Sequence, residues 1–443
     1  MANPCAVTRV LYVDLCPSPG GSNISLLHLV SHLDRRQVQP LVALAAVNPF
    51  TRFEEAGIAV VRIHTPRWER QPAGLTAQVP PGEAHAKAQM PPSPAEWLSI
   101  DRLRAGKLAE TMRGSPWRAG LWHTAGGARR LARDELPVAL SLRRIMRSFR
   151  PHLVHLNDVL PLNRPGVMAS RSVGLPVVCH CRSFATATPA DNRWLLPGVD
   201  GMIFISQAIA EAHLAAMPPL RHYAVIPNAV DLSNYAGPVD RAAVRASLGV
   251  PADALLLVMA GRISPWKGQH IFVEALARVR ETHPAVYGVI VGLAEEADGP
   301  GYAGRVQAQA EALGLGQHLH MAGFRADIPQ VLRAADVVVH CSVKPEPFGR
   351  VIIEGMAAGR PVVASALGGT VEIIADGVDG LLTPAGDPAA LAAALRRLLA
   401  DPEERERLGQ TGRSTVARRY QVDAHVRAVR TFYERVLAAR CEA

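Results

Sequence analysis

Short apolar segments alternate with segments of helical spacing along most of the chain, and this pattern constrains the fold more than any other feature. Runs rich in Val, Ile and Leu between turn residues are typical of strands buried on both faces of a sheet. In the first half, such strands are expected at 7–15, 38–47, 57–64, 151–158, 175–183 and 200–206. Helical spacing follows the first of them over 24–33. The alternation predicts a parallel, doubly wound α/β sheet.

The same pattern starts again in the second half. Expected strands lie at 254–262, 285–292, 318–323, 336–342 and 360–365, and expected helices lie at 268–283 and 327–335. We therefore predict an N-terminal Rossmann-like domain over 1–225 and a C-terminal one over 226–420, joined where Pro, Asn and Gly cluster at 226–238. The amphipathic segment 422–439 predicts a last helix within 421–443 that packs on one of the domains.

Residues 64–135 interrupt the alternation. The stretch 80–94 is rich in proline, and four of the six tryptophans lie in this segment among arginines. One interpretation is an extra helical subdomain with a small core of its own. The other is a basic surface that contacts an anionic membrane or covers an acceptor. The four tryptophans are Trp68, Trp97, Trp117 and Trp122.

Composition narrows the class of protein. The formal net charge of +9 favours a polyanionic partner, and nucleic acid, anionic lipid and diphosphate ligands all fit it. No apolar run approaches the roughly 18 residues of a spanning helix, and the first residues lack the pattern of a signal peptide. Six scattered cysteines show no metal-ligand spacing, so we expect reduced thiols, no metal and a cytoplasmic chain. No segment resembles a module that reads nucleic acid.

Two loops at expected strand ends are suited to anions. The turn at Gly20 and Gly21 can present backbone N–H groups at a helix N-terminus, although it is not the GxGxxG of dinucleotide sites and is also typical of an ordinary tight turn. The segment GRISPWKGQ at 261–269 brings Arg262 and Lys267 to one loop, where they predict a diphosphate clamp. The alternative is two solvated surface cations.

The segment KPEPFGRVIIEGMAAGRPVVAS at 344–365 carries two carboxylates, Glu346 and Glu354. Glu346 follows an expected strand and is therefore predicted in the ligand crevice. Phe348 and Gly349 begin a helix whose first N–H groups can face a phosphate or a sugar. Glu354, in apolar surroundings, is suited to binding a pair of ligand hydroxyls. The alternative is a structural cation that pairs with Glu354.

These motifs resemble family-4 retaining glycosyltransferases, which have the GT-B fold. The family's E-x7-E element appears as EPFGRVIIE, and GRISPWKG is similar to its G-R-x(4,5)-K-G loop. The run at 361–382 and the hinge motif at 226–235, with Ala229 in place of Gly, are similar as well. The match is almost continuous from 226 to 400, whereas the N-terminal half matches in outline. The resemblance implies two Rossmann-like domains facing a cleft, with the last helix crossing back to the first domain.

The resemblance also implies roles for these residues. Arg262 and Lys267 would bind the diphosphate of a nucleoside-diphosphate sugar and stabilise the leaving group. Glu346 would contact the transferred sugar, and Glu354 would bind the ribose hydroxyls. The remaining donor contacts would come from the glycine turn of the first domain, from amides beside Glu346 and from the backbone near the nucleobase; they are Gly20, Gly21, Phe348, Gly349, Phe324 and Arg325. No metal or other cofactor is implied.

One position departs from the family pattern. A His usually stands six residues past the Pro of the P-V-V strand, and counting from Pro176 that position holds Arg182, while His180 lies two residues earlier on the same strand face. Either side chain could point into the cleft as a catalytic group. His155 and Asp158, at another strand end, could contact the acceptor.

The function implied is retaining transfer of a hexosyl group to a saccharide or lipid-linked acceptor, in the synthesis of a cell-surface polysaccharide or glycoconjugate. The enzyme would lie in the cytoplasm or on the inner face of the cell membrane, in peripheral contact with anionic lipid, without a nucleic-acid partner. One alternative is another GT-B enzyme, a sugar-nucleotide epimerase or a phosphorylase. The other is a non-catalytic basic protein that binds membrane or nucleic acid.

Overall fold

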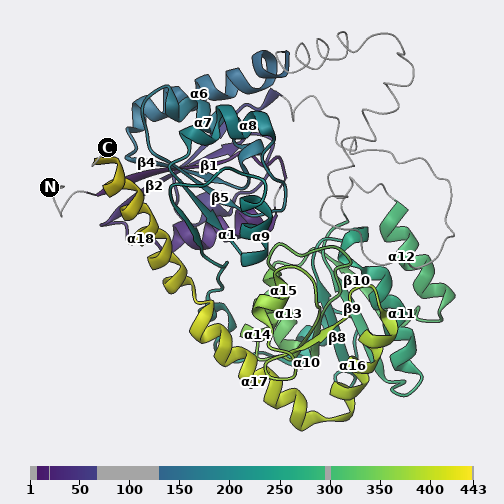
Figure 1. Cartoon of the computed structure of the whole chain (residues 1–443). Coiled ribbons are helices and arrows are strands. Elements are labelled where there is room, and N and C mark those ends of the chain that lie inside the picture. Colours follow the sequence, from purple (N-terminus) through teal and green to yellow (C-terminus); the bar gives the residue numbers. More distant parts are fainter. Residues whose placement is uncertain (1–6, 19, 67–128, 295–300, 442–443) are drawn as a thin grey trace, which may run out of the picture.

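The computed structural model of the chain describes residues 7–18, 20–66, 129–294 and 301–441. They form two α/β domains, and the last two helices run along one side from the C-terminal domain to the N-terminal one (Figure 1). Most of the segment 64–135, with its four tryptophans, lies outside the described residues. Both interpretations of that segment therefore stay predictions.

The first domain contains a parallel sheet of seven strands in the order β3-β2-β1-β4-β5-β6-β7. The strands are β1 (Thr8–Asp14), β2 (Val38–Ala45), β3 (Val60–Ile63), β4 (Leu153–Asn157), β5 (Val177–Cys181), β6 (Gly201–Phe204) and β7 (Tyr223–Val225). The first six lie within the predicted strands. β7 was not predicted, because it has three residues and exposed ends and so lacks an apolar run.

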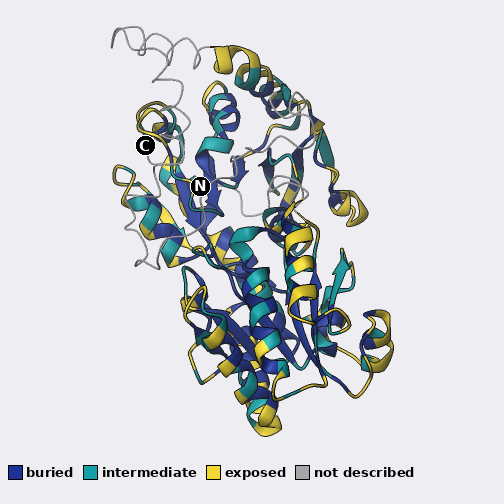
Figure 2. Cartoon of the chain, turned by 90° about the vertical axis from the view of Figure 1, so that its right-hand side faces the viewer, coloured by how far each residue is buried: buried dark blue, intermediate teal, exposed yellow. Residues whose placement is uncertain are grey.

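Helices cover both faces of this sheet. They are α1 (Gly21–Ser31), α2 (Arg52–Glu55), α6 (Leu136–Phe149), α7 (Arg164–Arg171), α8 (Pro189–Trp194) and α9 (Gln207–Leu214). A π-helical segment at Leu131–Glu135 leads into α6, and short 3₁₀ turns lie at Leu160–Leu162 and Leu196–Gly198. Alternate residues of a strand enter opposite cores. In β1, Leu11 and Val13 pack in the core with α6, whereas Val10 and Tyr12 pack in the core with α1. Figure 2 shows the resulting layers, with buried strands between helices that expose their outer faces.

The second domain contains a parallel sheet of six strands in the order β10-β9-β8-β11-β12-β13. The strands are β8 (Leu255–Ala260), β9 (Val286–Val291), β10 (Leu319–Gly323), β11 (Val337–His340), β12 (Val362–Ser365) and β13 (Leu381–Thr383). The helices are α10 (Arg241–Ser247), α11 (Gln269–Arg280), α12 (Gly301–Ala312), α13 (Ile328–Ala334), α14 (Arg350–Ala357), α15 (Thr370–Ile373), α16 (Pro388–Ala400) and α17 (Pro402–Arg419), with short turns at Leu232–Tyr235 and Pro265–Lys267. The three-residue strand β13 was not predicted.

The last helix, α18 (Val422–Cys441), packs on the first domain, as the resemblance implied. Phe432 and Tyr433 lie in the core with β1 and α1, and Tyr433 hydrogen bonds to His155 of β4 at 2.7 Å. Gly201 of β6 permits this approach, since a Cβ atom there would lie 2.8 Å from Cζ of Phe432. The chain therefore returns to the N-terminal domain after completing the C-terminal one.

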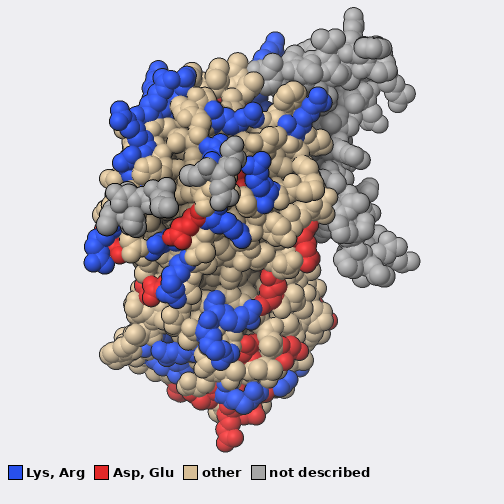
Figure 3. Space-filling model, turned by 60° about the vertical axis from the view of Figure 1, so that its left-hand side comes forward, with Lys and Arg blue, Asp and Glu red and all other residues tan. Residues whose placement is uncertain are grey.

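Charge is distributed unevenly between the domains on the face shown in Figure 3. Lys and Arg side chains dominate the upper, N-terminal domain, whereas the lower domain carries both signs. None of the helices in the described ranges is long and apolar enough to cross a membrane.

Candidate active site

A cavity of about 550 Å³ opens between the two domains. Its walls are formed by residues that follow strands of both sheets, which is where parallel α/β sheets bind ligands. All but one of the predicted catalytic and donor-binding residues line it. They are Gly20, Gly21, Arg182, Arg262, Lys267, Phe324, Arg325, Glu346, Phe348, Gly349 and Glu354, and the exception is His180.

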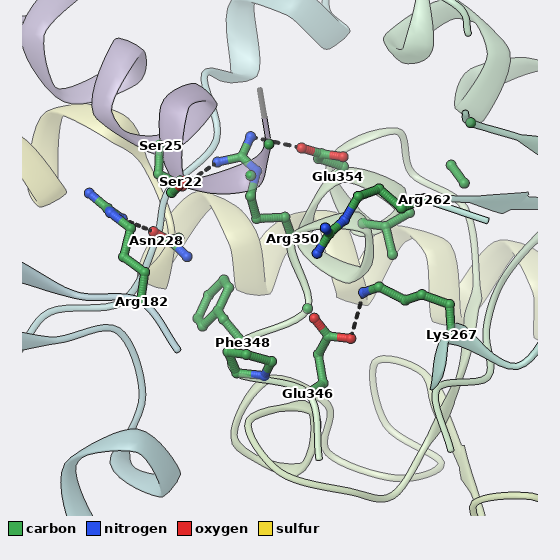
Figure 4. Close-up of a pocket in the computed structure, with 18 of the residues that line it drawn as sticks. Ser22, Ser25, Arg182, Asn228, Arg262, Lys267, Glu346, Phe348, Arg350 and Glu354 are labelled. Carbon is green, nitrogen blue, oxygen red and sulfur yellow. Dashed lines mark hydrogen bonds and ion pairs between the residues drawn. The ribbon is translucent and has the colours of Figure 1, made fainter. Parts of the chain in front are cut away.

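Glu346 and Lys267 form an ion pair on the wall of the second domain, with 2.7 Å between the Lys267 Nζ atom and the Glu346 Oε2 atom (Figure 4). The same oxygen lies 3.1 Å from Nε2 of His340 and 2.9 Å from Oγ of Ser342. Burial favours the neutral acid, but the charge of Lys267 and the contact with His340 outweigh it and hold the pKa of Glu346 well below its usual range. A buried carboxylate is therefore kept ionised at the cavity wall.

Glycines hold the backbone around this pair. Gly268 adopts a left-handed conformation (φ 78°), and a Cβ atom there would lie 2.0 Å from the carbonyl oxygen of Cys341 at the end of β11. On the other side, the N–H of Gly369 donates to the carbonyl of Glu346 at 2.8 Å, and a Cβ atom on Gly368 would meet that carbonyl at 2.5 Å. These glycines therefore let the backbone beside Lys267 approach Cys341, and let the backbone at Gly368 and Gly369 approach Glu346.

Arg262 lies beside this pair, in the loop after β8. Figure 4 shows its guanidinium and the Lys267 ammonium extending into the same region of the cavity. The ring of Trp266 lies 4.1 Å from the Lys267 nitrogen, in a cation–π contact. Two cations therefore lie at one wall, where the clamp was predicted, and Lys267 also neutralises Glu346. Diphosphate binding by this pair stays a prediction.

Glu354 has a cation partner, which was the alternative interpretation for it. An Arg350 N–H donates to Oε1 of Glu354 at 2.8 Å, and another donates to Oγ of Ser25 at 3.0 Å (Figure 4). Ser25 belongs to α1, so Arg350 links the two domains across the cavity. Ribose binding by Glu354 stays a prediction, and it requires the carboxylate to share or exchange this partner.

The glycine turn of the first domain closes the cavity opposite α14. Gly20 precedes α1, and its N–H donates to Oδ1 of Asn23 at 2.9 Å. A Cβ atom on Gly21 would lie 3.5 Å from Cδ of Arg350, so the turn approaches the second domain closely. The N-terminal end of α1 therefore borders the cavity, a position that favours an anion.

Arg182 reaches the cavity and His180 does not, although the Arg182 guanidinium lies 3.3 Å from Nδ1 of His180. Arg182 lines the cavity and donates to Oδ1 of Asn157 at 2.6 Å and to Oδ1 of Asn228 at 2.8 Å. His180 is fully buried behind it, with its ring 5.2 Å from that of His155. Burial lowers the pKa of His180 well below its usual value, which favours the neutral ring. The expectation that His180 reaches the cleft is therefore corrected, and His155 lies outside the cavity as well.

Sequence reasoning missed a second contact between the domains. The carboxylate of Glu372 in α15 accepts hydrogen bonds from the N–H groups of Gln207 (2.7 Å) and Ala208 (2.8 Å), at the start of α9 in the first domain. Ser206 donates to the carbonyl oxygen of Pro347, next to Glu346, at 2.7 Å. The only sequence signal for this contact was the place of Glu372 in the run at 361–382.

Outer positions of the cavity are more exposed. The side chain of Phe324 is 69% exposed although it lines the cavity, which leaves an aromatic face open at the end of β10. Arg325 beside it is paired with Asp327 at 2.7 Å. Within the ranges that the structure describes, no group of three or more His, Cys, Asp or Glu could hold a metal ion.

Two family models match this chain. The model of the group 1 glycosyl transferases matches residues 240–415, and that of glycosyltransferase family 4 matches residues 115–234. The D-inositol 3-phosphate glycosyltransferase of Segniliparus rotundus is 31% identical over 406 residues, which is 89% of this chain and 80% of that protein. LpsE of Rhizobium meliloti, a lipopolysaccharide core biosynthesis glycosyltransferase, is 35% identical over 44% of this chain and 54% of its own length.

Solved structures show the same architecture. Alr3699/HepE of Anabaena, solved in complex with UDP and glucose, superposes with a TM-score of 0.74 and 26% identity over 96% of this chain and 99% of that chain. A glycosyltransferase of Rickettsia africae has a TM-score of 0.73 over 97% of this chain and 99% of its own, and its 17% identity supports the fold alone. Both the predicted fold and the predicted family are confirmed. The chain belongs to the group 1 glycosyl transferases of glycosyltransferase family 4, with the GT-B fold.

Proposed function

We propose that this glycosyltransferase moves a hexosyl group from a nucleoside-diphosphate sugar to a hydroxyl of a saccharide or lipid-linked acceptor, with retention of anomeric configuration. The observation that carries the proposal is the meeting of Arg262, Lys267 and Glu346 at one wall of the cavity between the domains. Two cations suit a diphosphate, and an ionised carboxylate beside them suits the hydroxyls of the attached sugar.

Departure of the nucleoside diphosphate concentrates negative charge on the β-phosphate. Fixed cations that face this charge stabilise the transition state more than the ground state. Because Arg262 and Lys267 supply them, we infer that transfer needs no divalent cation and continues in the presence of EDTA. In the proposed front-face reaction, the bond from the sugar carbon to the phosphate breaks as the acceptor oxygen bonds to that carbon. The acceptor proton passes to the departing phosphate oxygen.

We propose further donor contacts from other residues that line this cavity. Glu354 would bind the ribose hydroxyls, and the exposed ring of Phe324 offers a face for the nucleobase. The complexes of Anabaena HepE with UDP and with UDP-glucose support a uridine donor here, since the two chains are 26% identical and share the fold. We therefore propose a UDP-hexose as the donor.

The names of the relatives support a role in glycoconjugate assembly. They include a glycosyltransferase of lipopolysaccharide core biosynthesis and several D-inositol 3-phosphate glycosyltransferases. We propose that this enzyme contributes to a cell-surface polysaccharide or glycoconjugate from the cytoplasmic side of the membrane. The basic face of the N-terminal domain is suited to a peripheral contact with anionic lipid (Figure 3).

Thermal shift with UDP, GDP, ADP and NAD at matched concentration tests the donor site. A ligand that binds the folded state alone raises the melting temperature according to its affinity, and we expect the largest shift with UDP. Release of UDP from UDP-glucose should fall strongly in Glu346→Ala while the UDP shift remains. Glu434→Gln, an exposed carboxylate on α18, is the control and should behave as wild type. Full activity of Glu346→Ala, or a shift with NAD alone, would contradict the proposal.

A further inference from the structure

Asp158 has an unusual backbone conformation at the edge of the cavity. Among non-glycine residues in the described ranges, only Asp158 (φ 77°) and Arg150 (φ 51°) have positive φ. Arg150 follows the last turn of α6, where a left-handed residue commonly ends a helix. Asp158 follows β4, and no helix end accounts for its conformation. Strained residues of this kind concentrate at functional sites.

A buried asparagine holds this conformation in place. The side-chain amide of Asn163 donates to three successive carbonyl oxygens, those of Asn157 (2.8 Å), Asp158 (3.2 Å) and Val159 (3.1 Å). The N–H of Asp158 donates to the carbonyl of His180 at 3.0 Å, which continues the pairing of β4 with β5. The surrounding structure therefore determines where the Asp158 side chain points.

Asp158 lines the cavity on the wall of the first domain, as Arg182 and Ser183 do. Its Oδ1 atom accepts a hydrogen bond from the N–H of Val159 at 2.8 Å. Burial raises the pKa of Asp158, and hydrogen bonds from Val159 and Ser183 and the charge of Arg182 act against it. The proposed donor groups Arg262, Lys267, Glu346 and Glu354 all come from the second domain. Asp158 is thus a carboxylate on the wall opposite these four groups, where an acceptor can approach the sugar.

We propose that Asp158 binds an acceptor hydroxyl next to the one that attacks, and that this carboxylate selects neutral polyhydroxyl sugars over acceptors with a phosphate at that position. The inference rests on the proposed transferase function. A carboxylate accepts hydrogen bonds from sugar hydroxyls, whereas it repels a phosphate at short range. The Arg182 guanidinium donates to the side-chain amide oxygens of Asn157 and Asn228. It therefore holds this wall in place through those hydrogen bonds and not by pairing with Asp158.

The test uses Asp158→Asn and Asp158→Gly, since Asn and Gly tolerate a left-handed backbone. Transfer from UDP-glucose is measured to a panel of neutral sugars (glucose, galactose, mannose and myo-inositol) and to their monophosphates. We expect wild type to prefer the neutral sugars. Both variants should lose roughly 10- to 100-fold in kcat/KM for the neutral sugars, as for a lost hydrogen bond to a charged group. Their UDP-induced thermal shift should equal that of wild type. Arg150→Asn, at the other left-handed position, is the matched control and should keep full transfer.

Three results would overturn the assignment. The first is a wild-type enzyme that binds UDP but prefers the monophosphates or uses no neutral sugar of the panel. The second is unchanged transfer in both variants. The third is a UDP shift that falls together with transfer, which would place Asp158 in the donor site. A wild-type enzyme with no UDP shift and no UDP release would instead refute the proposed function itself, and the assignment with it.

Discussion

Replacing Lys267 by Met should destabilise the C-terminal domain through Glu346. Glu346 is 7% exposed, and its Oε2 atom is 2.7 Å from Lys267, 3.1 Å from His340 and 2.9 Å from Ser342. Removing one partner of a buried ion pair costs about 3–5 kcal/mol. His340 and Ser342 still contact the carboxylate, so we expect the lower end, about 3 kcal/mol. For a domain of this size, that corresponds to a fall of roughly 6–12 °C in melting temperature.

The loss of stability in Lys267→Met, relative to wild type, should grow as the pH rises. In wild type the pKa of Glu346 lies below its ordinary value of 4.5, so its stabilising contribution is complete above that value and is lost as the pH falls. Without Lys267, burial raises the pKa of Glu346 instead. The variant then keeps its stability at pH values below the ordinary pKa of Glu346 and loses stability as the pH rises above it. The difference between wild type and variant should therefore be larger at pH 8 than at pH 5.

Thermal unfolding without ligand at these two pH values measures the effect. The matched control is the double variant Lys267→Met/Glu346→Gln, which removes both charges and should recover most of the lost stability, because an uncharged pair leaves no buried ion unpaired. An equal loss of thermal stability at both pH values, or a double variant as unstable as the single one, would refute this reasoning.

Three further changes test contacts around the site. Gly268→Ala places a Cβ atom against the Cys341 carbonyl at a left-handed position, so it should abolish the UDP-induced thermal shift. Glu372→Gln weakens the carboxylate contact with the N-terminus of α9 in the other domain and should raise the UDP dissociation constant roughly two- to fivefold by titration calorimetry. Gly201→Ala forces a Cβ atom against Phe432 and should lower the free energy of unfolding by about 1–3 kcal/mol in urea titration, with recovery on adding Phe432→Leu.

Much of the architecture could be predicted from local sequence patterns. Most strands of both sheets lie in apolar runs, and such runs reflect burial on two faces wherever the chain later places them. β7 and β13 were missed because three residues are too few to show a pattern. Glu346 and Lys267 were found because their loops carry local glycine and proline signals that are typical of ligand loops at strand ends.

The sequence alone therefore determined the two-domain α/β fold, the family and the loops that form the cavity. Tertiary structure decided how the side chains of those loops are partnered. Arg350 meets Ser25 across 325 residues of chain, and Tyr433 meets His155 across 278. Apolar periodicity and turn chemistry act over a few neighbouring residues, so they can be read from a short window. Pairing across a cleft depends instead on where two separately folded sheets come to lie, and no short window contains that information.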